Sequence, residues 1–310
     1  MTVRTPKLVV LGSINMDLVV RCTAIPTPGQ TVMASSSNEF CGGKGANQAV
    51  AASMVNAQVD MIGCVGSDAF ADRLIENLRQ HRVGTEHIER SGEASSGLAV
   101  IAVDDRGQNS IMVVAGANAC ITRDQVENAR ALIASSDVLL VQLEIPIEAV
   151  LTGIQIAKEE GVRVILDPAP ALTHCPAELF QVDLICPNES EAAAMVGHAV
   201  DTYETAISAA HTLQSRGALH VAVTMGDKGT ILLTGSDHHV VPAFDINAVD
   251  STAAGDAFAG ALAVHWSEHG CLVDAVRFAN AAGALAASRR GAQSSMASYH
   301  EIETLWRTKK

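Results

Sequence analysis

The chain has 310 residues, of which 48% are hydrophobic, and this length can bury a full core without disulfides or structural metals. Its 34 acidic residues outnumber its 21 lysines and arginines, which gives a formal net charge of -13. Nucleic acid and anionic membranes require a basic surface, so neither is an expected partner, and an aromatic content of 3% leaves few side chains for stacking on bases.

The cysteine pattern indicates a reducing compartment. The seven cysteines are scattered singly, without a C-x-x-C pair, and their number is odd. Free thiols are therefore expected rather than a disulfide framework or a zinc site. The apolar run at residues 8–11 is too short for a signal peptide or a membrane span, so we expect a cytoplasmic protein.

The first predicted element is a buried parallel strand at residues 7–12, a short apolar run that ends at a glycine. Asn15 and Asp17 follow directly, so polar groups gather at the carboxyl end of this strand. Two β-hairpins are predicted next. One joins residues 18–20 to residues 31–33 around a Pro/Gly turn.

The second hairpin joins residues 98–103 to residues 110–114 around the turn at residues 104–107. The two hairpins together predict a small β unit. This unit would either cover a site as a lid or add edge strands to the main sheet, and the pattern alone leaves both arrangements open.

A glycine-rich stretch at residues 42–48 leads into an alanine-rich helical run at residues 49–55. Glycines there allow the backbone to approach a ligand closely. The stretch is not a P-loop, because it lacks the four-residue spacer before Gly-Lys and the Ser or Thr after Lys44. On local sequence it is either a functional site or an ordinary strand-to-helix connection.

After Ala119 the pattern alternates between helix and strand, which predicts an α/β fold. Predicted strands occupy residues 137–141, 162–166, 182–185 and 220–223. Each is followed by polar residues, among them Glu144, Asp167, Asn188, Glu191 and Asp227. Open parallel sheets bind ligands at the carboxyl ends of their strands, so a site is expected at this edge.

Residues 249–258 predict an anion site that leads into a helix. The apolar spacing starts a helix near Ala254, so its first free amides cluster around Gly255 and favour a phosphate. Asp256 in the first turn is either a base for an attacking hydroxyl or only a partner of the helix dipole. A late alanine-rich helix is predicted at residues 281–290, with residues 289–291 as its C-cap.

Residues 42–49 (GGKGANQA) and 250–258 (DSTAAGDAF) resemble the paired signatures of the ribokinase family of sugar and nucleoside kinases. The resemblance runs from residues 12–17 (GSINMD) to residues 291–295 (GAQSS) and is closest to the members that phosphorylate ribose. It implies a Rossmann-like α/β fold, with a mostly parallel central sheet flanked by helices and a small β-sheet lid.

The implied main domain binds nucleotide and sugar and comprises residues 1–14, 40–95 and 116–310. The implied lid comprises residues 15–39 and 96–115, and pairing of lids implies a homodimer.

The implied activity is ATP-dependent phosphorylation of D-ribose at its 5-hydroxyl, which yields ribose 5-phosphate and ADP. Asp256 would be the base, and the backbone amides of Ala253, Ala254, Gly255 and Asp256 would form the anion hole. Family patterns often have glycine where Ala253 stands. Besides Asp256, the implied sugar-binding residues are Asn15, Met16, Asp17, Gly43, Lys44, Gly45, Ala46, Asn47 and Glu144.

The resemblance also implies magnesium and potassium as cofactors beside ATP. Asn188 and Glu191 would hold magnesium through water. The implied nucleotide-binding residues are Asn188, Thr224, Met225, Gly226, Asp227, Lys228, Gly229, Gly255, Asp256 and Asn280. The implied potassium site consists of Asp250, Thr252, Ala286, Arg289, Gly291 and Ser295, which contribute mostly backbone carbonyls.

Two alternative functions remain open. One is a kinase of 2-deoxyribose, of another pentose or of a nucleoside, with Met16 and the lid setting the choice. The other is a sugar-sensing protein without catalysis, although retention of Asp256, Gly255, Asn188 and Glu191 together argues against it. Cys41 adjoins the predicted sugar loop, and we interpret it as a small packed thiol.

Overall fold

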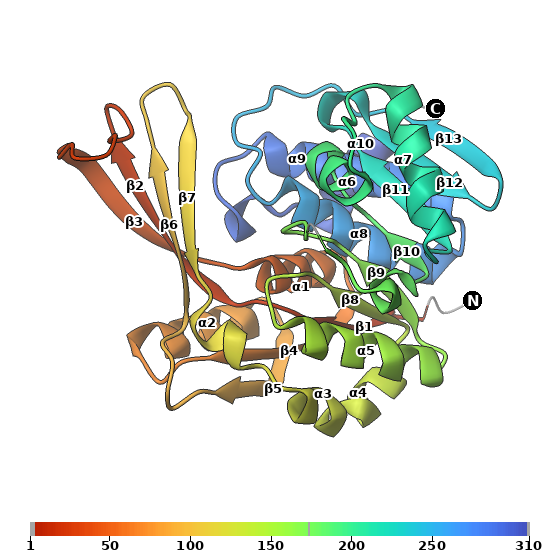
Figure 1. The fold of residues 1–310 in the computed structure, drawn as a ribbon, viewed down its shortest axis with the longest axis horizontal. Coiled ribbons are helices and arrows are strands. Elements are labelled where there is room, and N and C mark those ends of the chain that lie inside the picture. Colours follow the sequence, from red (N-terminus) through yellow and green to blue (C-terminus); the bar gives the residue numbers. More distant parts are fainter. Residues whose placement is uncertain (1–3, 173, 309–310) are drawn as a thin grey trace.

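The computed structural model describes residues 4–172 and 174–308 and contains two β-sheets of different size (Figure 1). The large sheet has nine strands in the order β13-β12-β11-β10-β9-β8-β1-β4-β5, and the small sheet has four in the order β3-β2-β6-β7. Neighbours in the large sheet pair in parallel, except that β12 runs antiparallel to both β11 and β13. The predicted α/β class with a mostly parallel sheet is confirmed.

Strands of the large sheet are short and buried where helices cover both faces. Leu8 and Val10 of β1 enter one hydrophobic cluster, and Val9 and Leu11 enter the other, as the alternation of side chains along a strand requires. The strand bounds are β1 Lys7–Leu11, β4 Gln58–Val65, β5 Val83–Arg90, β8 Val138–Val141, β9 Arg163–Leu166, β10 Leu184–Ile185, β11 His220–Thr224, β12 Thr230–Thr234 and β13 Asp237–Val241.

Helices form a layer on each face of the large sheet. The first cluster contains α1 Lys44–Met54, α2 Ala69–Gln80, α8 Ala254–His269, α9 Leu272–Ala287 and α10 Tyr299–Trp306. The second contains α3 Arg123–Asn128, α4 Arg130–Ala134, α5 Ile147–Glu159, α6 Glu189–Val196 and α7 Tyr203–Ser215. Short 3₁₀ helices are η1 Gly116–Cys120, η2 Ala177–Phe180, η3 Gly226–Lys228 and η4 Gln293–Ser295.

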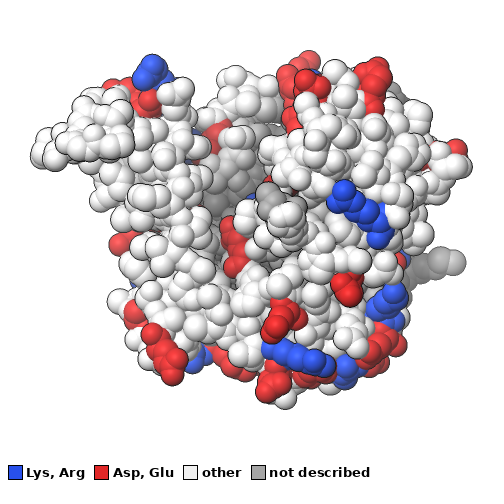
Figure 2. All heavy atoms as spheres, in the orientation of Figure 1, with Lys and Arg blue, Asp and Glu red and all other residues white. Residues whose placement is uncertain are grey.

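The small sheet projects from one side of the α/β body (Figure 1). It consists of β2 Asn15–Cys22, β3 Ala34–Gly42, β6 Gly97–Val103 and β7 Asn109–Val114. The two hairpins thus form a sheet of their own, and the alternative of extra edge strands on the main sheet is wrong. Figure 2 shows a hollow between this sheet and the C-terminal half of the chain, with acidic atoms on its walls.

Some predicted boundaries are wrong. The second strand of the first hairpin is Ala34–Gly42 rather than residues 31–33, because this edge strand is exposed along most of its length and therefore lacks an apolar pattern. The last alanine-rich helix begins at Leu272 and ends at Ala287, with Ser288 at its C-cap. Residues 289–291 therefore belong to the following loop and do not cap the helix.

The helical run predicted at residues 49–55 begins earlier, at Lys44, because Gly43 with φ 90° forms the N-cap. The start of α8 at Ala254 confirms the predicted helix start. Residues 1–3, 173 and 309–310 of the implied main domain lie outside the described residues. Across the described part of the chain, no helix is both long and apolar enough to cross a membrane.

Candidate active site

The carboxyl ends of the central parallel strands meet the amino ends of α1 and α8 around a small cavity of about 210 Å³. Lys44, Asp167, Asn188, Glu191 and Asp256 line it, together with backbone of the loop before α8. The structure thus brings together side chains from four separate segments at the edge where the sequence predicts a site.

Asp256 lies in the first turn of α8 and is 4% exposed. Its Oδ2 accepts a hydrogen bond from Asn47 Nδ2 at 2.9 Å, and its Oδ1 accepts one from Gln48 Nε2 at 3.0 Å. Both donors come from α1, which packs against α8 at Gly260. A Cβ at Gly260 would lie 2.8 Å from the Gln48 carbonyl oxygen, so this glycine lets the two helices approach closely enough to place the donors.

Each donor to Asp256 is itself oriented by another amide. Gln293 Nε2 donates to Asn47 Oδ1 at 3.1 Å, and Asn77 Nδ2 donates to Gln293 Oε1 at 2.5 Å. On the other side, Gln142 Nε2 donates to Gln48 Oε1 at 2.5 Å. Because the side-chain oxygens of Asn47 and Gln48 each accept a hydrogen bond, their side-chain nitrogens are oriented to donate to the Asp256 carboxylate.

Charges in the cavity shift one another's pKa values. Burial raises the pKa of Asp256, while the Lys44 ammonium and the donors Asn47 and Gln48 oppose that rise. Burial also raises the pKa of Asp167, to about 7. Burial alone would lower the pKa of Lys44, but the carboxylates around it, first Asp256 and then Asp167, raise it above its usual value. Lys44 therefore remains a cation beside the carboxylate of Asp256.

The polar side chains of Ser13, Asp17 and Glu144 form a cluster that can bind the hydroxyl groups of a ligand. Glu144 Oε2 accepts from Ser13 Oγ at 2.5 Å and from the Lys44 amide at 3.3 Å. Asp17 is 9% exposed, and burial, followed by repulsion from Glu144 and Asp256, raises its pKa to about 7. Gly42 leaves room for Asp17, because a Cβ there would collide with the carboxylate. The carboxylates of Asp17, Glu144 and Asp256 thus act on one another from different elements.

Other residues of the implied sugar set are packed in the interior. Met16 is fully buried in the first hydrophobic cluster, and Ala46 lies in the same cluster. A Cβ at Gly45 would lie 2.7 Å from the Ser13 amide nitrogen, so Gly45 serves close backbone packing. The position of Met16 argues against direct contact between its side chain and a sugar.

A larger cavity of about 810 Å³ lies beyond Gly255 and extends toward α9. From the implied nucleotide set, its walls include Asn188, Thr224, Gly226, Asp227, Gly229, Gly255 and Asn280. The sequence reasoning missed its apolar wall, which includes Phe244, Ile246, Ala284 and Ala287. No local motif marks these residues, because the cavity needs only their shape and apolar character.

Three residues of the implied nucleotide set are engaged elsewhere. Met225 is buried in the second hydrophobic cluster. The Lys228 ammonium bonds to Glu189 at 3.2 Å and to the Asp201 carbonyl at 2.7 Å. The Asn280 amide accepts from Thr230 and donates to two backbone carbonyls, so it forms a fixed part of the cavity wall.

The loop before α8 presents backbone donors to the small cavity. Ala253 forms the N-cap with φ 59° and ψ 13°, in the left-handed region. The Ala254 amide donates to the Ser251 carbonyl at 3.2 Å, so it is engaged, contrary to its implied role in the anion hole. Within the described chain, the amides of Ala253, Gly255 and Asp256 have no hydrogen-bond acceptor, which leaves these three for an anion.

Asp250 ties the loop before α8 to the loop after α9. Its carboxylate accepts from the amides of Thr252 and Gly291, both at 3.0 Å. Burial raises the pKa of Asp250, but these hydrogen bonds outweigh burial and lower it overall. The remaining implied ligands are partly engaged: Arg289 pairs with Glu301 at 2.6 Å, Ser295 Oγ donates to the Ala292 carbonyl, and the Ala286 carbonyl accepts from the Arg289 amide.

Three residues of the site have no role in the sets that the resemblance implies: Gln48, Asp167 and Gln293. Gln48 Nε2 bridges Asp256 and Asp167, lying 2.7 Å from Asp167 Oδ2. Asp167 carried a signal, because it follows a predicted strand, and Gln48 adjoins Asn47 within the glycine-rich stretch. Gln293 lies in the quoted stretch at residues 291–295, but its contact with Asn47, 246 residues away in the chain, could not be predicted from the sequence.

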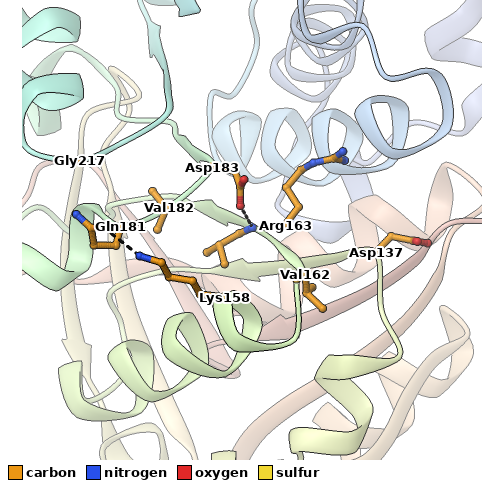
Figure 3. Close-up of a pocket in the computed structure, with 10 residues that line it drawn as sticks. Asp137, Lys158, Val162, Arg163, Gln181, Val182, Asp183 and Gly217 are labelled. Carbon is orange, nitrogen blue, oxygen red and sulfur yellow. Dashed lines mark hydrogen bonds between the residues drawn. The ribbon is translucent and has the colours of Figure 1, made fainter. Parts of the chain in front are cut away.

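A cavity of about 480 Å³ lies at the opposite end of the sheet (Figure 3). It is lined by Asp137, Lys158, Arg163, Gln181 and Asp183, which flank the amino ends of β8, β9 and β10. Several of its polar groups are paired: Lys158 Nζ donates to Gln181 at 3.2 Å, and Asp183 accepts from the Val164 amide at 2.7 Å. This cavity takes no part in the site around Asp256.

Known proteins resemble this chain over nearly its whole length. Ribokinase from Haemophilus influenzae is 38% identical over 294 residues, which are 95% of this chain and 96% of that protein. Deoxyribokinase from Salmonella typhi is 37% identical over 296 residues, which are 95% of this chain and 97% of that protein. The structure of Arabidopsis thaliana ribokinase complexed with ribose and ATP is 30% identical with a TM-score of 0.89, covering 98% of this chain and 99% of that one.

The model of the family described as "pfkB family carbohydrate kinase" matches residues 5–298. This match and the identities above agree with the resemblance of the two signature stretches, and they extend it across both sheets and all the segments that meet at Asp256. The chain therefore belongs to the pfkB family of carbohydrate kinases.

Proposed function

We propose that the protein transfers the γ-phosphoryl group of ATP to the 5-hydroxyl of D-ribose, giving ribose 5-phosphate and ADP. One observation carries the proposal: the buried Asp256 carboxylate accepts two hydrogen bonds, lines the small cavity beside Gly255, which also lines the large cavity, and interacts with the carboxylate of Asp17. The ribokinases among its relatives, and the neighbour complexed with ribose and ATP, support this choice.

In the proposed reaction the sugar lies against Asn15, Asp17, Asn47 and Glu144, with its 5-hydroxyl toward Asp256. Asp256 takes the hydroxyl proton as the oxygen attacks the γ-phosphorus in line. The amides of Gly255 and Asp256 donate to the transferred group, and the α8 dipole favours its negative charge. Burial raises the pKa of Asp256, which suits it to take the hydroxyl proton, while the α8 dipole opposes part of that rise.

Magnesium fits beside Asn188 and Glu191. The two residues form a capping box on α6, in which the Asn188 amide donates to Glu191 Oε2 and the Glu191 amide donates to Asn188 Oδ1, both at 2.9 Å. Glu191 Oε1 takes no part in this capping box, and both side chains line the small cavity. Magnesium usually keeps several waters and binds few carboxylates, so these residues would hold its hydration shell while the ion neutralises phosphate charge.

Potassium would bind where Asp250 joins its two loops. Asp250, with backbone carbonyls from Thr252, Ala286, Arg289, Gly291 and Ser295, would provide the oxygen ligands that a monovalent cation requires. The Asp250–Gly291 hydrogen bond supports this placement, since it holds the two loops together. A bound cation there would stabilise the loop that carries the anion-binding amides.

We further propose that the small sheet, residues 15–39 and 96–115, is a lid on the main domain. A cleft of about 780 Å³ separates it from the loops at Asp250 and Arg290, and closure would exclude water as a competing acceptor. Exposed Ile111, Met112 and Val113 on β7 fit a homodimer formed through lids. Light scattering of the purified protein tests whether it forms a homodimer. Its free cysteines are consistent with a location in the reducing cytoplasm.

The experiment that tests the activity measures sugar-dependent ADP release with ribose, 2-deoxyribose, fructose and adenosine, each with and without potassium. We expect ribose to be the best acceptor. The deoxyribokinase relative is almost as similar as the ribokinase, at 37% against 38% identity, so 2-deoxyribose is the competing substrate. A strong preference for 2-deoxyribose would change the substrate, and ribose binding without turnover would indicate a sensor.

Replacement of the base gives the second test. Asp256→Asn keeps the side-chain volume but removes the proton acceptor, so turnover should fall at least about 100-fold while ribose binding persists. Single-turnover kinetics and calorimetric binding of ribose measure the two effects separately. Undiminished turnover would refute the assignment of Asp256 as the base.

A further inference from the structure

The four strands of the small sheet join the main body at one junction. Asn15 at the start of β2 pairs with Gly42 at the end of β3 and with Gly97 at the start of β6. The chain leaves β7 at Val114 and continues into η1, which returns it to the body. Asn118 of η1 therefore lies where the last lid strand and the first one meet the α/β domain.

The side chain of Asn118 is 1% exposed and makes three hydrogen bonds at this junction. Its Oδ1 accepts from the Ile14 amide at 2.9 Å. Its Nδ2 donates to the Ile14 carbonyl at 3.3 Å and to Asn15 Oδ1 at 2.7 Å. One amide thus holds both the backbone of Ile14 and the side chain of Asn15.

This arrangement fixes the orientation of the Asn15 amide. Asn15 Oδ1 is occupied by Asn118, and within the described residues nothing accepts a hydrogen bond from Asn15 Nδ2. The space around the pair is tight, because a Cβ at Gly97 would collide with both Asn15 Oδ1 and Asn118 Nδ2. The Asn15 amide therefore cannot turn over without loss of the Asn118 bond.

We propose that Asn118 is a positioning residue of the sugar site, holding the Asn15 carboxamide with Nδ2 available as a donor to a sugar hydroxyl and tying the first lid strand to the segment that leaves the lid. The proposal rests on the proposed function, since it assigns Asn15 to the sugar. It places a sugar-binding determinant in a residue that does not touch the sugar and that belongs to neither signature stretch.

Asn118→Asp tests the proposal. The substitution keeps the size and the acceptor for the Ile14 amide, but it replaces the Nδ2 donor by a carboxylate oxygen that repels Asn15 Oδ1. Asn15 should then turn its Nδ2 toward the new carboxylate, so that this donor no longer serves the sugar. We expect KM for ribose to rise about tenfold or more, with KM for ATP within about twofold of the wild-type value.

Gln125→Glu is the matched control. Gln125 is also a buried amide near η1, and its Nε2 donates to the Gly63 carbonyl at 2.7 Å, away from the sugar site. This variant should leave both KM values unchanged. Asn118→Ser, a smaller change that also weakens the bond to Asn15, replaces Asn118→Asp if the latter does not fold.

A double-mutant cycle separates positioning from general structural damage. If Asn118 acts through Asn15, then Asn118→Asp should raise KM for ribose no further in an Asn15→Ala background. Equal effects in both backgrounds, or an unchanged KM in the single variant, would overturn the proposal. A wild-type protein inactive on every sugar would instead refute the proposed function, so the two failures are distinguishable.

Discussion

Ala253 occupies a backbone conformation that usually requires glycine. It caps α8 at φ 59°, and the left-handed conformation costs a residue with a Cβ about 1–2 kcal/mol. The turn at Ala253 leads into the first turn of α8, whose Gly255 and Asp256 line the small cavity. Alanine adopts this turn at the cost of strain in the loop.

The prediction at this residue concerns stability. Ala253→Gly should raise the free energy of unfolding by about 0.5–1 kcal/mol, because relief of strain exceeds the extra chain entropy of glycine. Urea denaturation measures it, and Ala254→Gly at the next position, within the helix, is the control and should not stabilise. A loss of stability in Ala253→Gly would show that the left-handed conformation carries no strain.

Helix packing contributes to the pKa of Asp256 beside burial and the Lys44 charge, because it positions the two donors that lower that pKa. Gly260 lets α8 lie against α1, and α1 supplies Asn47 and Gln48 as donors to the two carboxylate oxygens. Gln293 of η4 donates a hydrogen bond to Asn47 and accepts one from Asn77 of α2. Three helices and a 3₁₀ turn thus determine the direction of the amides around the base.

A substitution that reverses the orientation of the Asn47 amide should shift the pH dependence of catalysis. Gln293→Glu removes the donor to Asn47 Oδ1 and attracts Asn47 Nδ2 away from Asp256. A carboxylate that loses a donor has a higher pKa, so Asp256 would keep its proton to higher pH. We expect kcat to fall about tenfold near neutral pH and the acidic limb of its pH profile to move to higher pH.

The Gln125→Glu control should leave this profile in place, since Gln125 lies outside the chain of amides. An unmoved acidic limb in Gln293→Glu would show that Asn47 holds its direction without Gln293. Rate measurements over the range from acidic to neutral pH, at saturating ATP and sugar, distinguish the two results.

Several carboxylates are buried near the carboxyl ends of the strands of the large sheet. Asp17 and Asp167 both have pKa values raised to about 7 from 3.8, mainly by burial. Between about pH 4 and 7 each stays protonated in the folded protein but ionises on unfolding. The unfolded state then binds fewer protons, so these groups make stability fall as pH rises through this window.

The corresponding prediction compares the wild type with Asp17→Asn. The free energy of unfolding of the wild type should decline relative to that of the variant as pH rises from about 4 to 7, because the amide has no charge to bury. Urea denaturation at several pH values measures the difference. A difference that stays constant across this window would contradict the raised pKa of Asp17.

The sequence by itself determined the α/β class, the position of the small β unit and the start of α8, because strand periodicity, turn residues and helix caps are local signals. Its two signature stretches also predicted that Asn47 and Asp256 share a site, and the two side chains are hydrogen-bonded at 2.9 Å. It placed the strand at residues 31–33 wrongly, since the exposed edge strand β3 has no apolar pattern.

Only the tertiary structure decided which of these side chains cooperate. The bonds from Gln293 to Asn47 and from Asn118 to Ile14 join residues 246 and 104 positions apart, a separation no local pattern encodes. The burial of Met16 in the core was likewise not predicted from the sequence, because it depends on the elements that pack around this side chain. Direction and burial of a polar group depend on neighbours supplied by distant segments, and folding alone brings those segments together.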